Sequence, residues 1–582
     1  MEFYAKNVAT NNHDDVLTSG GFYCIFVVIM FVDSSTTRLN GKAYPRHLLR
    51  ESYREAGKVK HRTIANLSHC KAEEVEAIRL ALRHKADLAG MVAAAAERAL
   101  ELVQGPSVGA VWLLSQLARD LGIVAALGSD RQGKLALWQV IARVLDQGSR
   151  LSAVRLAGGH AAGAALGMIS FDEDDLYANL DWLAQHQADI ETRLFAQRKP
   201  ASAPDVFLYD VTSTYLEGEQ NAFAAFGYNR DRKSGKRQIV IGLLCDADGR
   251  PLSIELFAGN TSDVKTFSSQ LSKAATRFGA ERVTFVGDRG MIKAPQRAEL
   301  GAADFHYITA ITKAQIDGLI AAGVLQMDLF EQTLAEVEGK DGERYVLRRN
   351  PARAEELAAS RQDKLTTLRT AGETANKYLR EHPRAAAKTQ LSKLKARAKT
   401  LHIDRFVQVA AEQRSVALTV DQEALTELAR LDGCYALRTD LPKAVVSKDV
   451  VHDRYKDLTR VEWAFRDSKS VHLEMRPVYL RAENRTRGHA VVVMLAYLMA
   501  QELRRRWRDS DLTVQEGLHR LAGLCVTEVR IGGRPSYNQV PKPRDDVRRL
   551  FDAASIAIPT ALPLAPARVA TKKKLPQRRK VK

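Results

Sequence analysis

Four short runs rich in β-branched and aromatic residues constrain the fold of this chain more than any other feature of its sequence. They are Asp205–Thr212, Arg237–Cys245, Leu252–Phe257 and Arg282–Val286. The turn signal Asp246–Gly249 joins the second run to the third, and the amphipathic stretch Ser262–Phe278 precedes the fourth. Neighbouring strands followed by a helix and a further strand predict an α/β fold, with residues 204–312 as the first part of its core.

The sequence before this core has a helical pattern. Apolar residues recur at three- and four-residue spacing in Lys71–Gln104, Val108–Leu127, Leu135–Leu145 and Asp174–Gln197. We therefore predict an α-helical domain over residues 70–200. We predict that residues 31–69 form a short β-rich segment, because the polar turn Arg38–Lys42 is typical of a hairpin. Residues 1–30 are interpreted in one of two ways. They are a disordered leader, or the translation start is assigned too far upstream and Met30 is the first residue.

The sequence after the first part of the core is less regular. Weak strand patterns occur at Phe305–Ile311, Arg344–Arg348 and Arg414–Val420, around the basic helical stretch Ala352–Lys399. Regular patterning resumes with a strand at Cys434–Thr439 and helices at Asp453–Lys469 and Ala490–Leu503. We predict an α+β insertion domain at residues 313–433, followed by the second part of the core with C-terminal helices at residues 434–550.

The charge of the chain favours an anionic partner. It carries 87 Lys and Arg against 69 Asp and Glu, a net charge of +18, which is typical of proteins that bind nucleic acid or acidic lipid. Residues 551–582 are predicted to be a basic disordered tail, since no acidic residue follows Arg568; it is either a DNA-contacting arm or a solubilising tail.

The apolar runs and the cysteines exclude two classes of protein. The runs Phe22–Val32 and Ala490–Ala500 are too short to cross a bilayer, so we expect a soluble cytoplasmic protein without a membrane partner. The five cysteines are scattered without a CxxC pair, which argues against a structural zinc site and suits a reducing compartment.

One phosphate-binding motif is matched only in its spacing. Gly128–Lys134 has the spacing of a P-loop, but Leu135 follows where magnesium binding needs Ser or Thr, and the residues before it predict a helix end. We do not expect a nucleotide there.

Three carboxylates are candidate ligands for a divalent cation. Asp210 lies at the end of the first strand of the core, Asp288 directly follows the fourth, and Glu462 lies in the helix after the last core strand. Strand ends are where polar groups can leave a buried sheet, and carboxylate oxygens suit Mg²⁺. Two such ions would polarise a scissile phosphate and stabilise the attacking and leaving oxygens. Each Asp alone is equally well explained as a turn former.

The helix around Glu462 adds a second pattern. Tyr455, Leu458, Glu462 and Lys469 fall near one stripe of a helix, so a phenol and an ammonium group would flank the carboxylate and contact phosphate oxygens. The alternative is an ordinary amphipathic helix whose apolar residues Leu458, Val461 and Phe465 face the core.

Several segments together resemble the DDE transposases of bacterial insertion sequences, in the branch named after insertion sequence four. They are Tyr209–Tyr215, Gly259–Asp263, Gly287–Met291 and Tyr455–Lys469, with Arg476–Tyr479 behind it. That branch marks its glutamate helix with the signature Tyr-x2-Arg-x3-Glu-x6-Lys. The resemblance implies an RNase H-like catalytic core, interrupted by the insertion domain, in which Asp210, Asp288 and Glu462 are both the catalytic and the metal-binding residues.

The sequence departs from this family pattern at two points. Leu458 occupies the arginine position of the signature, and Arg460 points to another side of the helix. Relatives can use a tryptophan of the insertion domain to hold a flipped base, but no Trp lies between Arg289 and Val461. The tyrosines Tyr307, Tyr345, Tyr378 and Tyr435 are possible substitutes, and we expect Trp463 to belong to the core.

The resemblance implies a cut-and-paste transposase that cleaves and joins DNA at terminal inverted repeats. It implies Mg²⁺ as the cofactor, with two ions and Mn²⁺ as a substitute, and double-stranded DNA, both the inverted repeats and the target, as the partner. DNA contacts are expected from Tyr455, Lys469, Arg289 and Arg466, with the helical domain at residues 70–200 also binding DNA. A homodimer in the synaptic complex and a bacterial cytoplasmic location, at the nucleoid when bound to DNA, are further expectations. The alternatives are an RNase H-like nuclease without strand transfer and a non-catalytic DNA-binding regulator or decayed transposase.

Overall fold

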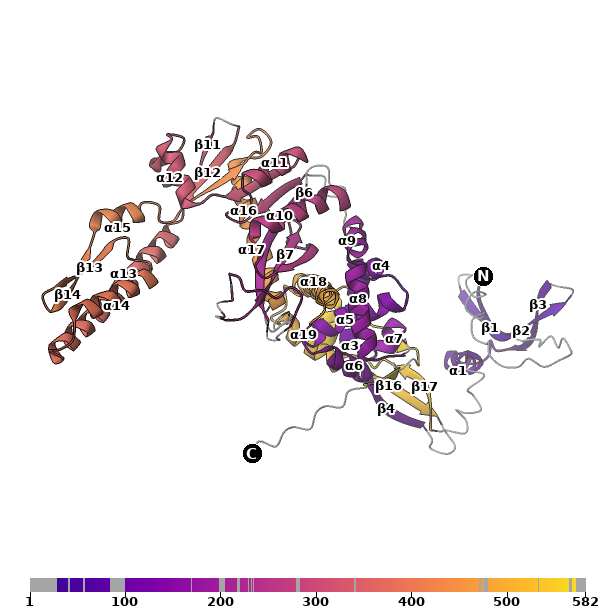
Figure 1. Cartoon of the computed structure of the whole chain (residues 1–582). Helices are drawn as coiled ribbons and strands as arrows, with labels where there is room; N and C mark the ends of the chain where they lie inside the picture. Colours follow the sequence, from indigo (N-terminus) through magenta and orange to yellow (C-terminus); the bar gives the residue numbers. More distant parts are fainter. Residues whose placement is uncertain are drawn as a thin grey trace. The chain divides into compact units, whose positions relative to one another are not determined.

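The computed structural model describes most of the chain in two compact units. The described residues are 29–39, 42–55, 58–83, 100–168, 170–197, 205–216, 220–228, 230–231, 233, 235–278, 283–339, 342–469, 473, 475, 480–531, 533–564 and 568–571. The first unit is Met1–Val103 with Val529–Ser536, and the second is Gln104–Glu528 with Tyr537–Lys582 (Figure 1). The predicted leader, residues 1–30, lies almost entirely outside the described residues.

The first unit contains a three-stranded antiparallel sheet. Its strands are β1 (Ile29–Leu39), β2 (Lys42–Glu55) and β3 (Lys58–Asn66), and helix α1 (Ala72–Arg83) packs against β1. Leu39 pairs with Lys42, which confirms the predicted hairpin.

The helix predicted over Lys71–Gln104 is wrong at its C-terminal end. The structure has strand β4 at Leu100–Ser107, next to strand β16 (Cys525–Ile531) in its sheet. Gly105 approaches Val526 so closely that a Cβ atom would lie 2.5 Å from the Val526 side chain. Pairing with a strand from far along the chain therefore overrides the local helical pattern, which carries only a weak preference of its own.

The second unit is built on a sheet of eight described strands. In spatial order they are β11 (Ala335–Glu338), β12 (Arg344–Arg349), β15 (Cys434–Thr439), β10 (His306–Ala310), β9 (Val283–Gly287), β6 (Asp205–Tyr215), β7 (Gln238–Cys245) and β8 (Pro251–Ala258). Strands β6, β9 and β10 run parallel to one another, and the other neighbours are antiparallel. With about 49% helix and 25% strand among the residues that the structure describes, the predicted α/β class is confirmed.

Side chains that alternate along β6 point to two different apolar layers. Leu208 belongs to a cluster shared with helices α5 (Arg131–Leu145), α8 (Glu173–Gln185), α17 (Leu458–Lys469) and α18 (Glu483–Arg506). Phe207, Tyr209 and Val211 belong to a second cluster with helices α10 (Asp263–Ser272) and α11 (Ala294–Ala302). Because side chains alternate between the two faces of a strand, Asp210 shares the face of Leu208, on the side of α17 and α18 (Figure 1).

The helices predicted before the core are present, with breaks. Val108–Leu127 forms α3 (Gly109–Asp120) and α4 (Ile123–Leu127), separated at Gly122 with φ +73°. Asp174–Gln197 forms α8 and α9 (Gln187–Ala196). In the P-loop-like stretch, the Asp130 carboxylate accepts a hydrogen bond from the Gly133 N–H at 2.7 Å, which caps α5. That contact explains the stretch as a helix start.

The remaining described elements follow in chain order. They are α6 (Arg150–Gly159), α7 (Ala162–Leu166), β5 (Ser170–Phe171), a π-helix at Lys273–Arg277, α12 (Lys313–Ala321), a 3₁₀-helix at Met327–Glu331, α16 (Lys448–Lys456), α19 (Val514–Ala522), β17 (Arg534–Gln539), α20 (Asp545–Ala553), β18 (Ala561–Leu562) and β19 (Arg568–Val569). The predicted tail at 551–582 therefore starts too early, and within it residues 565–567 and 572–582 lie outside the described residues. No helix of the described part is long and apolar enough to span a membrane.

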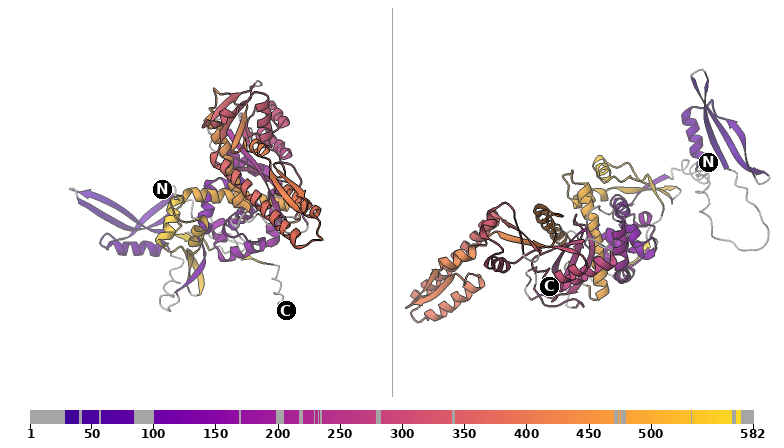
Figure 2. Two further views of the ribbon diagram at one scale, coloured as in Figure 1. Left: turned by 90° about the vertical axis from the view of Figure 1, so that its left-hand side faces the viewer. Right: turned by 90° about the horizontal axis from the view of Figure 1, so that it is seen from above.

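Residues 351–429 form a packing group of their own, which we call the excursion. It contains α13 (Pro351–Glu381), α14 (Ala387–Thr400), β13 (Val407–Glu412), β14 (Ser415–Val420) and α15 (Gln422–Ala429), which lie together in all views (Figures 1 and 2). Leu368, Leu379 and Phe406 are buried in its separate apolar cluster. Strands β11 and β12, which also fall in the predicted insertion domain, belong instead to the central sheet.

Candidate active site

Two of the three candidate carboxylates become neighbours through strand pairing. In the parallel pair β6–β9, Tyr209 lies opposite Gly287. Asp210 and Asp288 are the next residue on each strand, so both carboxylates leave the sheet at the same place. Asp210 is half-buried, whereas Asp288, directly after β9, is exposed. Asp288 directly follows β9, as predicted, whereas Asp210 lies within β6, which continues to Tyr215, and not at the strand end that the sequence predicted.

Helix α17 brings Glu462 to the same face of the sheet. Its residues Val461, Ala464 and Phe465 are buried, it packs against β6, and Glu462 is on its exposed side. The Lys469 ammonium, two turns along the helix, donates a hydrogen bond to Thr212 Oγ1 at 2.8 Å. Since Thr212 shares a strand face with Asp210, this contact fixes α17 over the carboxylates.

The environment of Asp210 disfavours its ionised form. Burial of the Asp210 carboxyl group raises its pKa to about 7, and the neighbouring charges of Asp288 and Glu462 add to the rise. The Val211 N–H, which donates to Asp210 Oδ1 at 2.7 Å, and the Arg230 guanidinium oppose it. Arg230 is itself held by both oxygens of Asp263 at 2.7 Å. A buried carboxyl group whose ionised form is disfavoured by neighbouring acids is a site to which a cation would be attracted.

Tyr455 contacts the site from another helix than the one predicted. The expected single helix Asp453–Lys469 is two helices, α16 and α17, which meet at Asp457. Tyr455 lies in α16, and its hydroxyl donates a hydrogen bond to Asp288 Oδ1 at 3.2 Å. Burial and the charge of Asp288 raise the pKa of Tyr455, so the phenol stays protonated and keeps donating at neutral pH.

The other expected DNA contacts divide into internal and surface residues. Lys469 forms an ion pair with Asp231 at 2.9 Å, and the two side chains are only 10% and 8% exposed. Arg289 and Arg466 are exposed, Arg289 directly after Asp288 and Arg466 one turn after Glu462 on α17. Sequence reasoning missed Arg230 and Asp231, because they lie in an irregular loop that carries no periodic pattern.

Two further expectations about α17 have opposite outcomes. Leu458 is buried, as the amphipathic-helix alternative predicts, and the Arg460 guanidinium contacts the Ala247 carbonyl and Asp248, away from the carboxylates. The prediction that Trp463 is a core residue is wrong, because its side chain is 62% exposed. It follows Glu462 on the polar side of the helix, outside the buried stripe.

Of the four tyrosines expected as possible stacking residues, one is exposed. Tyr378 is 42% exposed and stacks on His382 with ring centroids 4.2 Å apart. Tyr307 and Tyr345 are buried, and the Tyr435 hydroxyl hydrogen-bonds to His452.

The donor set fits a hard divalent cation. Its ligands would be carboxylate oxygens, the preferred donors of Mg²⁺, and Asp210 is half-buried with a raised pKa. Among the described residues, no three His, Cys, Asp or Glu side chains are already gathered so as to hold one ion. Asp210 and Asp288 are the adjacent pair, and Glu462 lies over them on an exposed helix face.

Comparisons with known proteins match two parts of the chain. Residues 32–95 match the model of the IS1634 family transposase N-terminal domain, and residues 201–499, just over half of the chain, match that of the transposase DDE domain. No curated protein matches. A cryo-EM structure of a piggyBac transposase synaptic complex with hairpin DNA is similar over 72% of this chain and 70% of that chain, at 9% identity and a TM-score of 0.31. On the strength of the DDE domain model, which covers more than half of it, the chain belongs to the DDE transposases, and its N-terminal region is similar to that of the IS1634 family.

Proposed function

We propose that this transposase cuts DNA at the terminal inverted repeats of its element and joins the freed ends to target DNA, in cut-and-paste transposition. Asp210, Asp288 and Glu462 are the catalytic and metal-binding residues, with two Mg²⁺ ions as the cofactor and Mn²⁺ as a substitute. The observation that carries this proposal is the pairing of β6 with β9, which makes Asp210 and Asp288 neighbours under α17. The family supports transposition as the biological process.

The chemistry is in-line attack at phosphorus, first by water and then by the freed 3′ hydroxyl. When bound, the divalent ions supply positive charge next to the attacking oxygen, the leaving oxygen and the phosphate between them. The protein itself positions these groups. Asp210 and Asp288 hold the site at the sheet, Glu462 closes it from α17, and Tyr455 orients Asp288 through its hydrogen bond at 3.2 Å.

The surrounding residues have separate roles in this proposal. Arg289 and Arg466, exposed beside Asp288 and Glu462, contact DNA phosphates. Lys469, with its ion pair to Asp231 and its hydrogen bond to Thr212, holds α17 against β6 and reaches DNA only if that pair opens.

The fold and assembly that we propose follow the family. Strands β8, β7, β6, β9 and β10 form an RNase H-like core, and residues 313–433 hold the insertion domain. The helical region 70–200 binds DNA, and a homodimer pairs the two element ends. The protein acts in the bacterial cytoplasm, at the nucleoid when bound to DNA.

Cleavage and joining of DNA that carries the ends of the element test the proposal. Wild-type protein with Mg²⁺ should nick the end DNA and join it to a target duplex. Asp288→Ala should abolish both reactions while end binding stays within a few fold. Glu299→Gln, which removes an exposed carboxylate on α11, is the matched control and should leave both unchanged.

Three other outcomes would contradict parts of the proposal. Retained cleavage in Asp288→Ala would rule out the triad. Cleavage without joining by the wild type would favour the nuclease alternative, and binding without any Mg²⁺-dependent product would favour a non-catalytic DNA-binding protein.

A further inference from the structure

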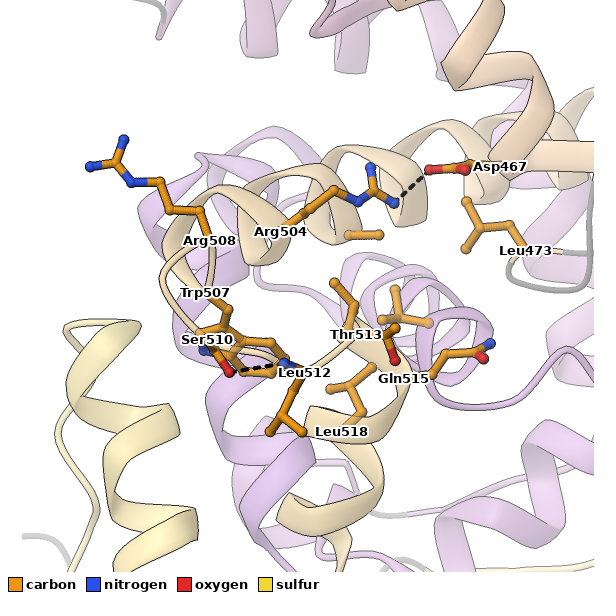
Figure 3. A pocket seen from close by; sticks show the side chains of 13 residues that line it. Asp467, Leu473, Arg504, Trp507, Arg508, Ser510, Leu512, Thr513, Gln515 and Leu518 are labelled. Atoms are coloured by element: carbon orange, nitrogen blue, oxygen red, sulfur yellow. Dashed lines mark hydrogen bonds and ion pairs between the residues drawn. The ribbon is translucent and has the colours of Figure 1, made fainter.

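Two cavities of the second unit have linings that do not suit a new anion site. The cavity at Trp507 is mostly apolar, with Leu473, Leu512 and Leu518 in its wall and the Asp467–Arg504 ion pair at its edge (Figure 3). A second cavity, next to Trp463, contains four arginines, but all of them are paired with carboxylates, for example Arg505 with Glu502 and Arg460 with Asp248.

A third cavity, which we call the basic cavity, adjoins the candidate active site. Its volume is about 340 Å³, and its polar lining includes Lys293, Arg297, Thr309, Thr312 and Arg438. In the parallel pair β9–β10, Thr309 lies opposite Gly287, the residue before Asp288. The Thr309 hydroxyl also donates to the Asp288 carbonyl oxygen at 3.3 Å. The cavity therefore lies at the carboxyl ends of parallel strands, where ligands bind in open α/β sheets.

The charges around the basic cavity do not cancel. No acidic residue is among the described residues that line it, whereas Lys293, Arg297 and Arg438 bring three positive charges. Glu343 forms ion pairs with both Arg297, at 3.3 Å, and Arg438. The charged residues of the lining are therefore all positive, and two of them share the carboxylate of Glu343.

Glu343 also fixes the position of these guanidinium groups. The Tyr307 and Tyr345 hydroxyls donate hydrogen bonds to it at 3.0 Å and 3.2 Å, and its side chain is only 17% exposed. An arginine held from one side presents its other N–H groups with little further loss of entropy, which favours recognition of phosphate oxygens. The N-terminus of α11 begins at this cavity and adds a partial positive charge.

We propose that the basic cavity binds a non-scissile backbone phosphate of the DNA strand that is cut at Asp210 and Asp288. This inference rests on the proposed function, because it places the second phosphate relative to the cleaved one. By holding a neighbouring phosphate at Lys293, Arg297 and Arg438, the protein fixes the register of the strand across the carboxylates. These three are positioning residues, and the scissile phosphate lies at the carboxylates.

The test couples one protein charge to one DNA charge. Duplexes that carry an element end are made with a single neutral methylphosphonate at successive positions around the cleavage point, and their Kd values are measured without metal. For wild-type protein, one methylphosphonate near the cleavage point should weaken binding about fivefold. In Lys293→Ala the same replacement should have no effect, because the partner charge is already gone. Cleavage of the unmodified duplex with Mg²⁺ is measured separately.

Two further variants keep this experiment interpretable. Arg438→Gln combined with Glu343→Gln removes a cation together with its carboxylate, so that Glu343 keeps no excess negative charge, and Arg297 retains its own charge without this carboxylate. It should show the same coupling as Lys293→Ala. Lys377→Ala, an exposed charge on α13, is the control and should leave the effect of every methylphosphonate unchanged. Urea unfolding of each variant checks that it is folded.

The outcomes separate this inference from the proposed function. Both the inference and the proposed function are supported if the wild type cleaves the DNA and the variants abolish the effect of one methylphosphonate near the cut. If the wild type cleaves the DNA but neither variant changes the effect of any methylphosphonate, the inferred role of the basic cavity is wrong and the proposed function stands. Absence of cleavage in the wild type overturns both, even if coupling is found. If inorganic phosphate or a deoxynucleoside monophosphate raises the Tm of the wild type but not of Lys293→Ala, and the DNA shows no coupling, the cavity takes a free phosphate and the inference is wrong.

Discussion

At the scale of single residues, the protonation of Asp210 links the environment of the site to its chemistry. The carboxyl group is half-buried in a sheet next to Asp288, and its pKa is raised to about 7, first by burial and then by the charges of Asp288 and Glu462. A carboxyl group binds a cation only in its ionised form, so it must lose its proton when a metal enters. Near neutral pH, metal binding and proton release are therefore in direct competition.

The affinity for Mg²⁺ should depend steeply on pH below neutrality. Below pH 7 Asp210 is mainly protonated, so the apparent affinity should rise by about tenfold per pH unit and level off above pH 7. Titration of Mg²⁺ followed by calorimetry between pH 5.5 and pH 8.5 measures this dependence. A flat profile would show that Asp210 does not bind the ion, and Asp210→Asn should lose the dependence altogether.

Tyr455 should act on the metal site more than on DNA. Tyr455→Phe removes the hydrogen bond to Asp288 Oδ1 and keeps the ring, so Mg²⁺ affinity and the cleavage rate should each fall about tenfold. Metal-free DNA affinity should change less than about twofold, because a tyrosine releases no counterions from DNA. If DNA affinity falls and cleavage at saturating DNA does not, Tyr455 is a DNA contact, as the resemblance implies.

At the scale of secondary-structure elements, Lys469 is a polar anchor that holds the C-terminal end of α17 against β6. Lys469 is 10% exposed and paired with the 8% exposed Asp231, and it also donates to Thr212 on β6. The apolar stripe of the helix, with Val461 and Phe465, sets its distance from the sheet, whereas the anchor sets its rotation and register.

Removing this anchor should cost stability. Lys469→Met should lower the free energy of unfolding by about 3 kcal/mol, because it leaves the buried Asp231 without this cation. Urea unfolding measures the loss, and the double variant Lys469→Met with Asp231→Asn should recover part of it. The opposite result is that stability is unchanged and that the slope of log K for DNA binding against log salt concentration becomes shallower by about one. That result would make Lys469 a phosphate contact.

Elements with local signals were predictable from the sequence, and those set by distant contacts were not. Strand β7 and the turn Asp246–Gly249 follow from composition and turn chemistry. The break between α16 and α17 has no such signal, and it moves Tyr455 off the stripe of Glu462. The exposure of Trp463 was missed for a related reason, since hydrophobicity alone predicts burial, whereas its position on the helix decides.

For the candidate site as well, features with a local signal were predictable and contacts between distant residues were not. Adjacency of Asp210 and Asp288 follows from the parallel pairing of β6 with β9, although the sequence placed Asp210 at a strand end and β6 continues to Tyr215. The contacts of Tyr455 with Asp288 and of Lys469 with Asp231 join residues far apart in the chain. One of these partners lies in an irregular loop, which periodicity cannot place.

At the scale of the whole molecule, the excursion leaves the central sheet and returns to it at one point. It starts after β12 and ends before β15, and these strands are paired, with Arg349 opposite Cys434. The Asn350 N–H donates to the Gly433 carbonyl oxygen at 2.9 Å, so the two ends of the segment touch. The excursion also has an apolar cluster of its own, which includes Leu368 and Leu379. Both properties are those of an inserted domain that does not take part in the folding of its host.

The excursion and the rest of the chain should therefore fold separately. A variant in which a short glycine-containing turn replaces residues 351–432 should keep a cooperative thermal transition, because β12 and β15 then form a hairpin in their present register. The isolated segment 350–433 should show helical circular dichroism and unfold cooperatively in urea. Leu379→Ala should destabilise that isolated segment by about 2–5 kcal/mol, as expected for a fully buried leucine. The same substitution in the full chain should leave the melting of the remaining parts unchanged. An unfolded segment together with an aggregated deletion variant would show that the two parts depend on each other for folding.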